Sequence, residues 1–247
     1  MHKSLDVENL SASYGETQVL ENISFSMKAG RLVGIIGPNG SGKSTLLKGI
    51  LGLIPLDTGE VKFCHEPLSK VRKRVAYKPQ SSEIDWDFPI TVIDTVLLGT
   101  YPKLGLFKRP GKRERDLAMK CLGKVGMADF AQRQISEMSG GQRQRVFLAR
   151  ALAQEAECFF LDEPFVGIDA SSEEIIINNL KELRDLGKTI YLVHHDLTKV
   201  TSYFDDIILI NKKLYGAGPV EDIFKKEIME EAFGSSLSVF YNWEVKS

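Results

Sequence analysis

The chain has few of the features that mark secreted, zinc-binding or membrane-spanning proteins. Its 247 residues include only three cysteines, Cys64, Cys121 and Cys158, which lie far apart and form no CxxC pair. This spacing indicates neither a disulfide framework nor a zinc site, so we expect small core residues or reduced thiols. No uncharged apolar run approaches the roughly 20 residues of a membrane-spanning helix.

Targeting signals and excess charge are missing as well. Residues 1–6 (MHKSLD) lack the apolar core of a secretory signal peptide. The formal net charge of −1 gives no general attraction to nucleic acid or to anionic lipid. We therefore expect a cytoplasmic protein without a nucleic-acid partner, which can still dock on a membrane protein.

One glycine-rich octapeptide has a clear chemical meaning. It fits the pattern G-x-x-x-x-G-K-[ST], follows the apolar run 32–36 and leads into helix-forming residues that begin with Thr45. Strand, loop and helix in this order are typical of a phosphate-binding loop, although a glycine-rich turn with an exposed lysine is the alternative. The octapeptide is Gly37-Pro38-Asn39-Gly40-Ser41-Gly42-Lys43-Ser44.

The residue types of this loop suit a nucleoside triphosphate. Glycines permit positive φ and close approach of the main chain, so that successive N–H groups converge on phosphate oxygens at a helix start. Lys43 can reach the β- and γ-phosphates, and the Ser44 hydroxyl can bind Mg²⁺. The sequence therefore predicts a triphosphate site with Mg²⁺.

Apolar runs alternate with amphipathic segments over most of the chain, which predicts an α/β protein with a mostly parallel sheet covered by helices. Several short strands are expected within residues 4–36, with a turn at 14–17. Later strands are expected at 60–63, 74–77, 158–161, 189–193 and 207–210. Helices are expected at 43–53, 142–154 and 172–186, the last capped by Ser171 or Ser172.

Residues 82–138 have a different, helical pattern. Helices are expected at 91–98 and 112–125, separated by residues 101–105, and the basic cluster 108–113 is interpreted as a solvated loop. We expect a single domain in which this stretch is inserted. The core of the domain would consist of residues 1–81 and 139–220, and a C-terminal helix and tail would follow at 221–247.

Two acids follow the apolar run 158–161. An acid at the end of a buried strand can hold Mg²⁺, and a second one can orient or deprotonate an attacking water. Asp162 and Glu163 are placed for these two tasks, because successive residues of a strand point in opposite directions. The alternative is an acidic turn that caps a helix.

A second glycine pair precedes an arginine-rich helix. Ser139-Gly140-Gly141-Gln142 follows Met138, and N–H groups at such a helix start can bind an anion. One triphosphate loop does not require a second phosphate site in the same chain, so the nucleotide of a second copy is the economical occupant. The run resembles the LSGGQ signature of the ATP-binding cassette (ABC) ATPases, with methionine in place of leucine.

This resemblance covers nearly the whole chain and implies the fold and the roles of the motifs. The fold would be an ABC-type P-loop ATPase core with a mostly parallel sheet, an N-terminal antiparallel β subdomain and an inserted helical subdomain. It would hydrolyse ATP with Mg²⁺ as a homodimer. Lys43, Gln80, Glu163 and His195 would take part in hydrolysis, and Ser44, Gln80 and Asp162 would hold Mg²⁺. The residues implied to contact ATP are Tyr14, Gly37 to Ser44, Thr45, Ser139, Gly140, Gly141, Gln142 and Asp169.

Two of these assignments have alternatives. The ring of Tyr14 would stack on adenine or else only cover the core. Between the two histidines we assign the family's histidine to His195, because it directly precedes Asp196. A metal site formed by His194, His195 and Asp196 is the alternative for that segment.

A narrower resemblance points to one group of ABC ATPases. Residues 79–92 (PQSSEIDWDFPITV), residues 165–169 (FVGID) and the pair His194-His195 resemble the ATPase subunits of manganese, zinc and iron importers. The implied function is uptake of a divalent metal ion, manganese ahead of zinc or iron, at the cytoplasmic face of the cell membrane. An alternative is a soluble ABC ATPase in an assembly complex, for example for iron–sulfur clusters.

The importer resemblance also implies partners. Integral membrane permease subunits would dock near Gln80 and Asp85 to Val92, and an extracytoplasmic metal-binding protein would act indirectly. Trp86 and Phe88 would receive a short helix of the permease, or else they seal the core.

Overall fold

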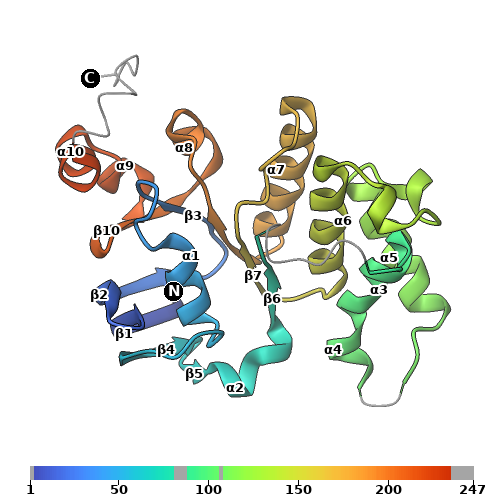
Figure 1. Cartoon of the computed structure of the whole chain (residues 1–247), viewed down its shortest axis with the longest axis horizontal. Helices are drawn as coiled ribbons and strands as arrows, with labels where there is room; N and C mark the ends of the chain where they lie inside the picture. Colours follow the sequence, from blue (N-terminus) through green and yellow to red (C-terminus); the bar gives the residue numbers. More distant parts are fainter. Residues whose placement is uncertain (1–2, 81–87, 106–107, 235–247) are drawn as a thin grey trace. The chain divides into compact units, whose positions relative to one another are not determined.

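The computed structural model describes residues 3–80, 88–105 and 108–234 (Figure 1). These residues divide between two compact units. Unit 1 takes the chain up to Arg72 and from Thr189 onward, and unit 2 is Lys73–Lys188. The predicted segment Asp85 to Val92 lies partly outside the described residues, including Trp86, and the tail from residue 235 lies wholly outside them.

Unit 1 begins with a long β-hairpin, blue in Figure 1. Strand β1 (Lys3–Tyr14) pairs antiparallel with β2 (Thr17–Lys28), and the sheet continues through β4 (Thr58–Phe63) to β5 (Glu66–Pro67) in the order β2-β1-β4-β5. The turn predicted at 14–17 is confirmed, since Tyr14 pairs with Thr17.

The two strands of 12 residues correct the prediction of several short strands within residues 4–36. Asn9 and Asn22 have φ of 51° and 50°, and the β1–β2 register shifts at these positions. Polar residues that resemble strand breaks are therefore accommodated as bulges inside continuous strands.

A second sheet of unit 1 is built around β3 (Leu32–Ile36). Strand β3 runs parallel to β8 (Thr189–Val193) and to β9 (Asp206–Asn211), and β10 (Lys213–Pro219) pairs antiparallel with β9. Every residue of β3 and β8 is buried, as expected of strands covered on both faces. Because parallel strands end at the same edge, the segments that follow β3 and β8 lie together.

The helices of unit 1 are short. Helix α1 ends at Ile50 and not at residue 53, because Gly52 adopts φ 60° and stops it. Residues 217–234 comprise the end of β10 and two short helices. The helices are α1 (Lys43–Ile50), α2 (Leu68–Val71), α8 (Val200–Tyr203), α9 (Val220–Ile223) and α10 (Lys226–Phe233), with a 3₁₀ turn at Leu197–Lys199.

Unit 2 combines a parallel strand pair with helices. Strand β6 (Val75–Lys78) pairs with β7 (Cys158–Leu161), and α6 packs against α3 and α5 (Figure 1). The helices are α3 (Val92–Leu97), α4 (Tyr101–Leu104), α5 (Lys112–Lys124), α6 (Gly140–Ala153) and α7 (Ala170–Asp185). The 3₁₀ turns are Arg72–Arg74, Leu98–Thr100, Ala128–Phe130 and Ile135–Glu137.

Two predictions for unit 2 were wrong in detail. Residues 101–104, expected as a connection, form α4, because Pro102 occupies its first turn, where the missing N–H needs no partner. Helix α7 is capped by Asp169 and not by Ser171 or Ser172. The predicted boundaries of the insertion at 82–138 stay a prediction. Among the described helices, none has the length and apolar character required to cross a bilayer.

Candidate active site

The glycine loop of unit 1 lies between a buried strand and a helix start. It leaves β3 and enters α1, whose first N–H groups have no partner within the helix and can bind an anion. Gly37, Gly40 and Gly42 have φ of 156°, 76° and 95°. A Cβ on Gly37 would lie 2.0 Å from the carbonyl oxygen of Ile210, so this position requires glycine.

Lys43 is held at the beginning of its own loop. Its Nζ donates to the carbonyl oxygens of Gly37 and Pro38 at 2.9 Å each. The loop is also tied to the β9–β10 turn, since the Lys212 N–H donates to the Ser41 carbonyl oxygen at 2.9 Å. The loop is thus shaped by contacts within unit 1, with its cation already in place.

Strand β8 brings the histidine pair to the same edge as the loop. The His194 N–H donates to the Ile35 carbonyl oxygen at 3.1 Å. The His194 ring is buried, with its centroid 5.6 Å from that of Phe204 and 5.8 Å from that of Tyr203. His195 is exposed. His194 is therefore a core residue, and His195 is the histidine that a ligand can reach.

Asp196 is engaged in a turn. Its Oδ1 accepts hydrogen bonds from the Thr198 N–H at 3.0 Å and the Thr198 hydroxyl at 2.6 Å. Burial opposes ionisation, but these hydrogen bonds hold the pKa of Asp196 below its ordinary value. Within the described ranges, no group of three or more His, Cys, Asp or Glu side chains is arranged to hold a metal ion.

Tyr14 ends β1 at the tip of the hairpin and is 51% exposed. About half of its surface is thus open, which suits stacking on a flat ligand better than covering the core. The next strand passes beside the glycine loop, because a Cβ on Gly42 would lie 2.6 Å from a methyl group of Leu20.

The two strands of unit 2 bring Gln80 and Glu163 together. Lys78 pairs with Leu161, and the residues that follow the strands meet where the Gln80 Nε2 donates to the Glu163 Oε2 at 2.9 Å. Asp162 is fully buried. Glu163 has φ 44°, a left-handed conformation that costs a non-glycine residue about 1 kcal/mol or more. The surrounding contacts must therefore hold this acid in place.

Sequence reasoning missed Lys78 beside these acids. The signal in the sequence was the alternation of strand residues, which puts Lys78 on the same face as Ala76. In β6 these two residues are buried, whereas Val75 and Tyr77 are partly exposed. Lysine is rarely fully buried without a partner. Burial lowers the pKa of Lys78 to about 8, although the carboxylates of Asp162 and Glu163 act in the opposite direction.

The Ser139 segment forms the capped start of α6. The Ser139 Oγ accepts from the Gln142 N–H at 3.3 Å, and the Gln142 Oε1 accepts from the Ser139 N–H at 2.9 Å. Gly141 lies against the segment after the acids, since a Cβ there would be 2.5 Å from the Gly167 carbonyl oxygen. At Gly140 the corresponding space is open.

Asp169 caps α7. Its Oδ1 accepts from the Ser171 hydroxyl and, at 2.9 Å, from the Ser172 N–H. These hydrogen bonds, that of Ser171 first, hold the pKa of Asp169 well below its ordinary value. Asp169 therefore stays ionised at the exposed start of this helix.

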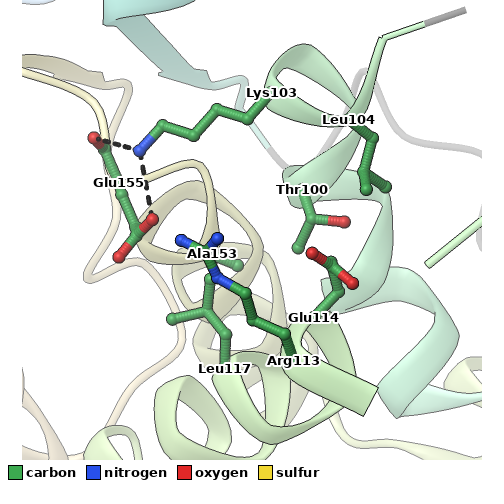
Figure 2. A pocket seen from close by; sticks show the side chains of 8 residues that line it. All are labelled: Thr100, Lys103, Leu104, Arg113, Glu114, Leu117, Ala153 and Glu155. Carbon is green, nitrogen blue, oxygen red and sulfur yellow. Dashed lines mark hydrogen bonds and ion pairs between the residues drawn. The ribbon is translucent and has the colours of Figure 1, made fainter. Parts of the chain in front are cut away.

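Unit 2 also contains a small cavity of about 90 Å³ near the last turn of α6 (Figure 2). At its edge the Lys103 Nζ lies 3.1 Å from the Glu155 Oε2, and Arg113 and Glu114 also line it. The charges of Lys103 and Arg113 offset those of Glu114 and Glu155, so the lining of the cavity carries no net charge. The start of α6 is about 20 Å away, at 1.5 Å per residue, so this cavity is separate from the Ser139 segment.

Comparison with known proteins agrees with these features. A family model described as ABC transporter matches residues 20–166. The manganese transport system ATP-binding protein MntB of Listeria monocytogenes is 56% identical over 236 residues, which cover 96% of this chain and 98% of that protein. The zinc transport system ATP-binding protein TroB of Treponema pallidum is 50% identical over 235 residues, covering 95% and 88%.

A solved structure shows the same fold. The dimeric structure of a bacterial ABC transporter cassette matches with a TM-score of 0.78 and 29% identity, covering 87% of this chain and 98% of that one. The chain therefore belongs to the ABC transporter family, as an ATPase of the ATP-binding cassette type.

Proposed function

We propose that this ATPase powers the uptake of a divalent metal ion, manganese first and zinc or iron next, through a membrane permease. The supporting observation is the similarity along almost the whole chain to proteins named for manganese and for zinc transport. The ion would pass through the permease and would not touch this chain. The partner proteins, including an extracytoplasmic metal-binding protein, would therefore select it.

The ATP chemistry is distributed over both units. In unit 1, Lys43 and the N–H groups at the start of α1 bind phosphate oxygens, Tyr14 stacks on the base and His195 contacts the γ-phosphate or the attacking water. In unit 2, Glu163 acts as general base and Gln80 orients the water. The 2.9 Å contact between Gln80 and Glu163 supports the last two roles.

The proposed Mg²⁺ donors are the Ser44 hydroxyl, the Gln80 amide oxygen and the Asp162 carboxylate. These hard oxygen donors fit Mg²⁺, which prefers such ligands. Ser44 is the second residue of α1, and Asp162 follows β7 directly. When bound with ATP, the ion would neutralise charge on the phosphates.

We further propose that two copies close around ATP. Exposed residues at the start of α6, Ser139 and Gly140, and Asp169 at the start of α7, would face the nucleotide of the partner copy. The dimeric structure of a similar cassette supports this arrangement. ATP binding would then close the dimer, and hydrolysis would release it.

The permease would dock beside Gln80 and residues 85–92, which would place the subunit peripherally at the cytoplasmic face of the membrane. Phe88 is 60% exposed, so it does not seal the core, and an exposed aromatic ring is suited to receive a short helix. Of residues 85–92, the structure describes 88–92.

The test is uptake and co-purification in a bacterial strain that lacks its own copy of this subunit. We expect the restored chain to sediment with membranes, to co-purify with a polytopic protein and to restore accumulation of radioactive manganese more than of zinc. If no membrane protein co-purified with the chain, and metal uptake stayed at the level of the strain that lacks the subunit, the transport proposal would be rejected.

A matched pair of variants tests the docking surface. Phe88→Ala should reduce co-purification of the membrane protein by about tenfold or more, as expected for an aromatic anchor worth about 2 kcal/mol. Leu186→Ala removes an even more exposed apolar side chain of unit 2 and serves as the control. Equal co-purification of both variants would remove the docking surface from the proposal.

A further inference from the structure

A buried lysine of unit 2 lies in the strand that pairs with the one before Asp162 and Glu163. Lys78 is the last residue of β6, and only 1% of it is exposed. A buried ammonium normally requires compensating charges and hydrogen-bond acceptors, because burial removes its hydration. The hydrogen bonds of Lys78 therefore indicate which parts of the chain its side chain stabilises.

Lys78 joins the ends of two neighbouring strands. Its Nζ donates to the Pro79 carbonyl oxygen at 3.2 Å and, at the long limit of 3.5 Å, to the Asp162 carbonyl oxygen. Its own carbonyl oxygen accepts from the Asp162 N–H at 3.0 Å. One residue thus connects β6 with the end of β7 through both its side chain and its main chain.

The two carbonyls that Lys78 binds belong to the residues directly before Gln80 and Glu163. Those two side chains meet at 2.9 Å, and Glu163 does so from the left-handed conformation at φ 44°. A shift of either main-chain segment would separate them. The lysine therefore lies where it controls the position of both.

The charged groups around Lys78 are consistent with a role in positioning Gln80 and Glu163. The carboxylates of Asp162 and Glu163 act on it favourably, while Arg150, on α6, acts unfavourably. The Arg150 guanidinium lies over the Phe147 ring at 4.7 Å. An apolar side chain of similar length would fill the same space without any charge to compensate, so packing alone does not require a lysine here.

We propose that Lys78 is a positioning residue for ATP hydrolysis, which holds Gln80 and Glu163 in their working geometry through the carbonyls of Pro79 and Asp162. This inference rests on the roles proposed above for Gln80 and Glu163. Lys78 itself touches neither ATP nor the attacking water.

The test compares variants of the purified full-length subunit. Lys78→Met keeps the length and removes the charge and the hydrogen bonds, so kcat should fall by about 10- to 100-fold, as for a misplaced catalytic group. The KM for ATP and the Kd for ATP measured by calorimetry should stay close to wild type, while the Tm should fall, because the buried Asp162 loses a favourable charge. Lys103→Met, which removes a lysine at the separate cavity, is the control and should keep full kcat.

Lys78→Arg keeps a cation and its hydrogen-bond donors, so its kcat should exceed that of Lys78→Met. Wild-type kcat in a folded Lys78→Met protein would overturn the proposal, as would equal losses of kcat in folded Lys78→Met and Lys78→Arg proteins. If Lys78→Met does not fold, Lys78→Gln takes its place, since it removes the charge and its donor nitrogen lies one bond nearer the main chain, which is too short to hold both carbonyl oxygens. The same loss of kcat is expected there, and wild-type kcat would overturn the proposal.

A double-mutant cycle separates this proposal from the role of Glu163. Glu163→Gln alone should abolish most turnover, and adding Lys78→Met should cause little further loss, because both act on one step. A multiplicative loss in the double variant would show that Lys78 does not act through Glu163. If Glu163→Gln alone kept wild-type kcat, the proposed general base would fail first, and this inference would fail with it.

Discussion

The glycine loop of unit 1 and the acid site of unit 2 are built in opposite ways. Lys43 bonds to carbonyls only five and six positions earlier in the chain, so consecutive residues form the loop. Gln80 and Glu163 are separated by 83 positions and meet only because β6 and β7 pair. A short motif can therefore specify the first site, whereas the second depends on the register of β6 and β7.

The largest effect is expected when Glu163, the proposed general base, is replaced. Glu163→Gln keeps the shape and the contact with Gln80 but cannot accept a proton, so kcat should fall by about 10²- to 10⁴-fold while ATP binding persists. Single-turnover ATP hydrolysis measures the change. Glu155→Gln, another acid of unit 2, is the control, and turnover of Glu163→Gln near the control rate would remove Glu163 from its role.

The next effect concerns the locally built loop. Lys43→Ala removes a buried cation with two hydrogen bonds, so the Kd for ATP should rise by about 10- to 100-fold, the value of a charged hydrogen bond. Calorimetric titration with ATP checks this. Lys48→Ala, on the same helix, should bind nearly as wild type. If Lys43→Ala retained full affinity, the loop would not be the phosphate site.

A smaller effect separates two adjacent glycines of α6. Gly141→Ala would place a Cβ 2.5 Å from the Gly167 carbonyl oxygen. We expect a loss of about 1–3 kcal/mol, and a Tm lower by about 3–10 °C by the usual relation for a chain of this size. Gly140→Ala meets open space and should keep or slightly raise Tm. Equal Tm values, measured by calorimetry, would contradict the close approach.

The smallest effect is a contrast in thiol reactivity between the units. Cys64 in unit 1 is exposed, whereas Cys121 and Cys158 in unit 2 are buried. Burial raises the pKa of Cys121 to about 11, so this thiol stays protonated at pH 8. Ellman's reagent should therefore titrate one thiol rapidly in the native protein and all three in guanidinium. Rapid native reaction of Cys121 would show that unit 2 opens readily.

The local motifs could be predicted because each needs only a few neighbouring residues. The loop from Gly37 to Ser44, the turn at 14–17 and the strand 189–193 were found from residue types and spacing. Errors arose where packing overrode local preference. Bulges at Asn9 and Asn22 kept long strands intact, and Asp169 took the cap expected of a serine.

The sequence by itself determined that this protein binds a triphosphate, that two acids follow a buried strand, and that it resembles the ABC ATPases, because these features consist of contiguous residues. Only the tertiary structure decided that Gln80 meets Glu163, that Gly141 lies against Gly167, and that the buried Lys78 bonds to the Asp162 carbonyl oxygen. Each of these depends on the register of strands and the packing of helices distant in sequence. No local pattern of side chains encodes such distances.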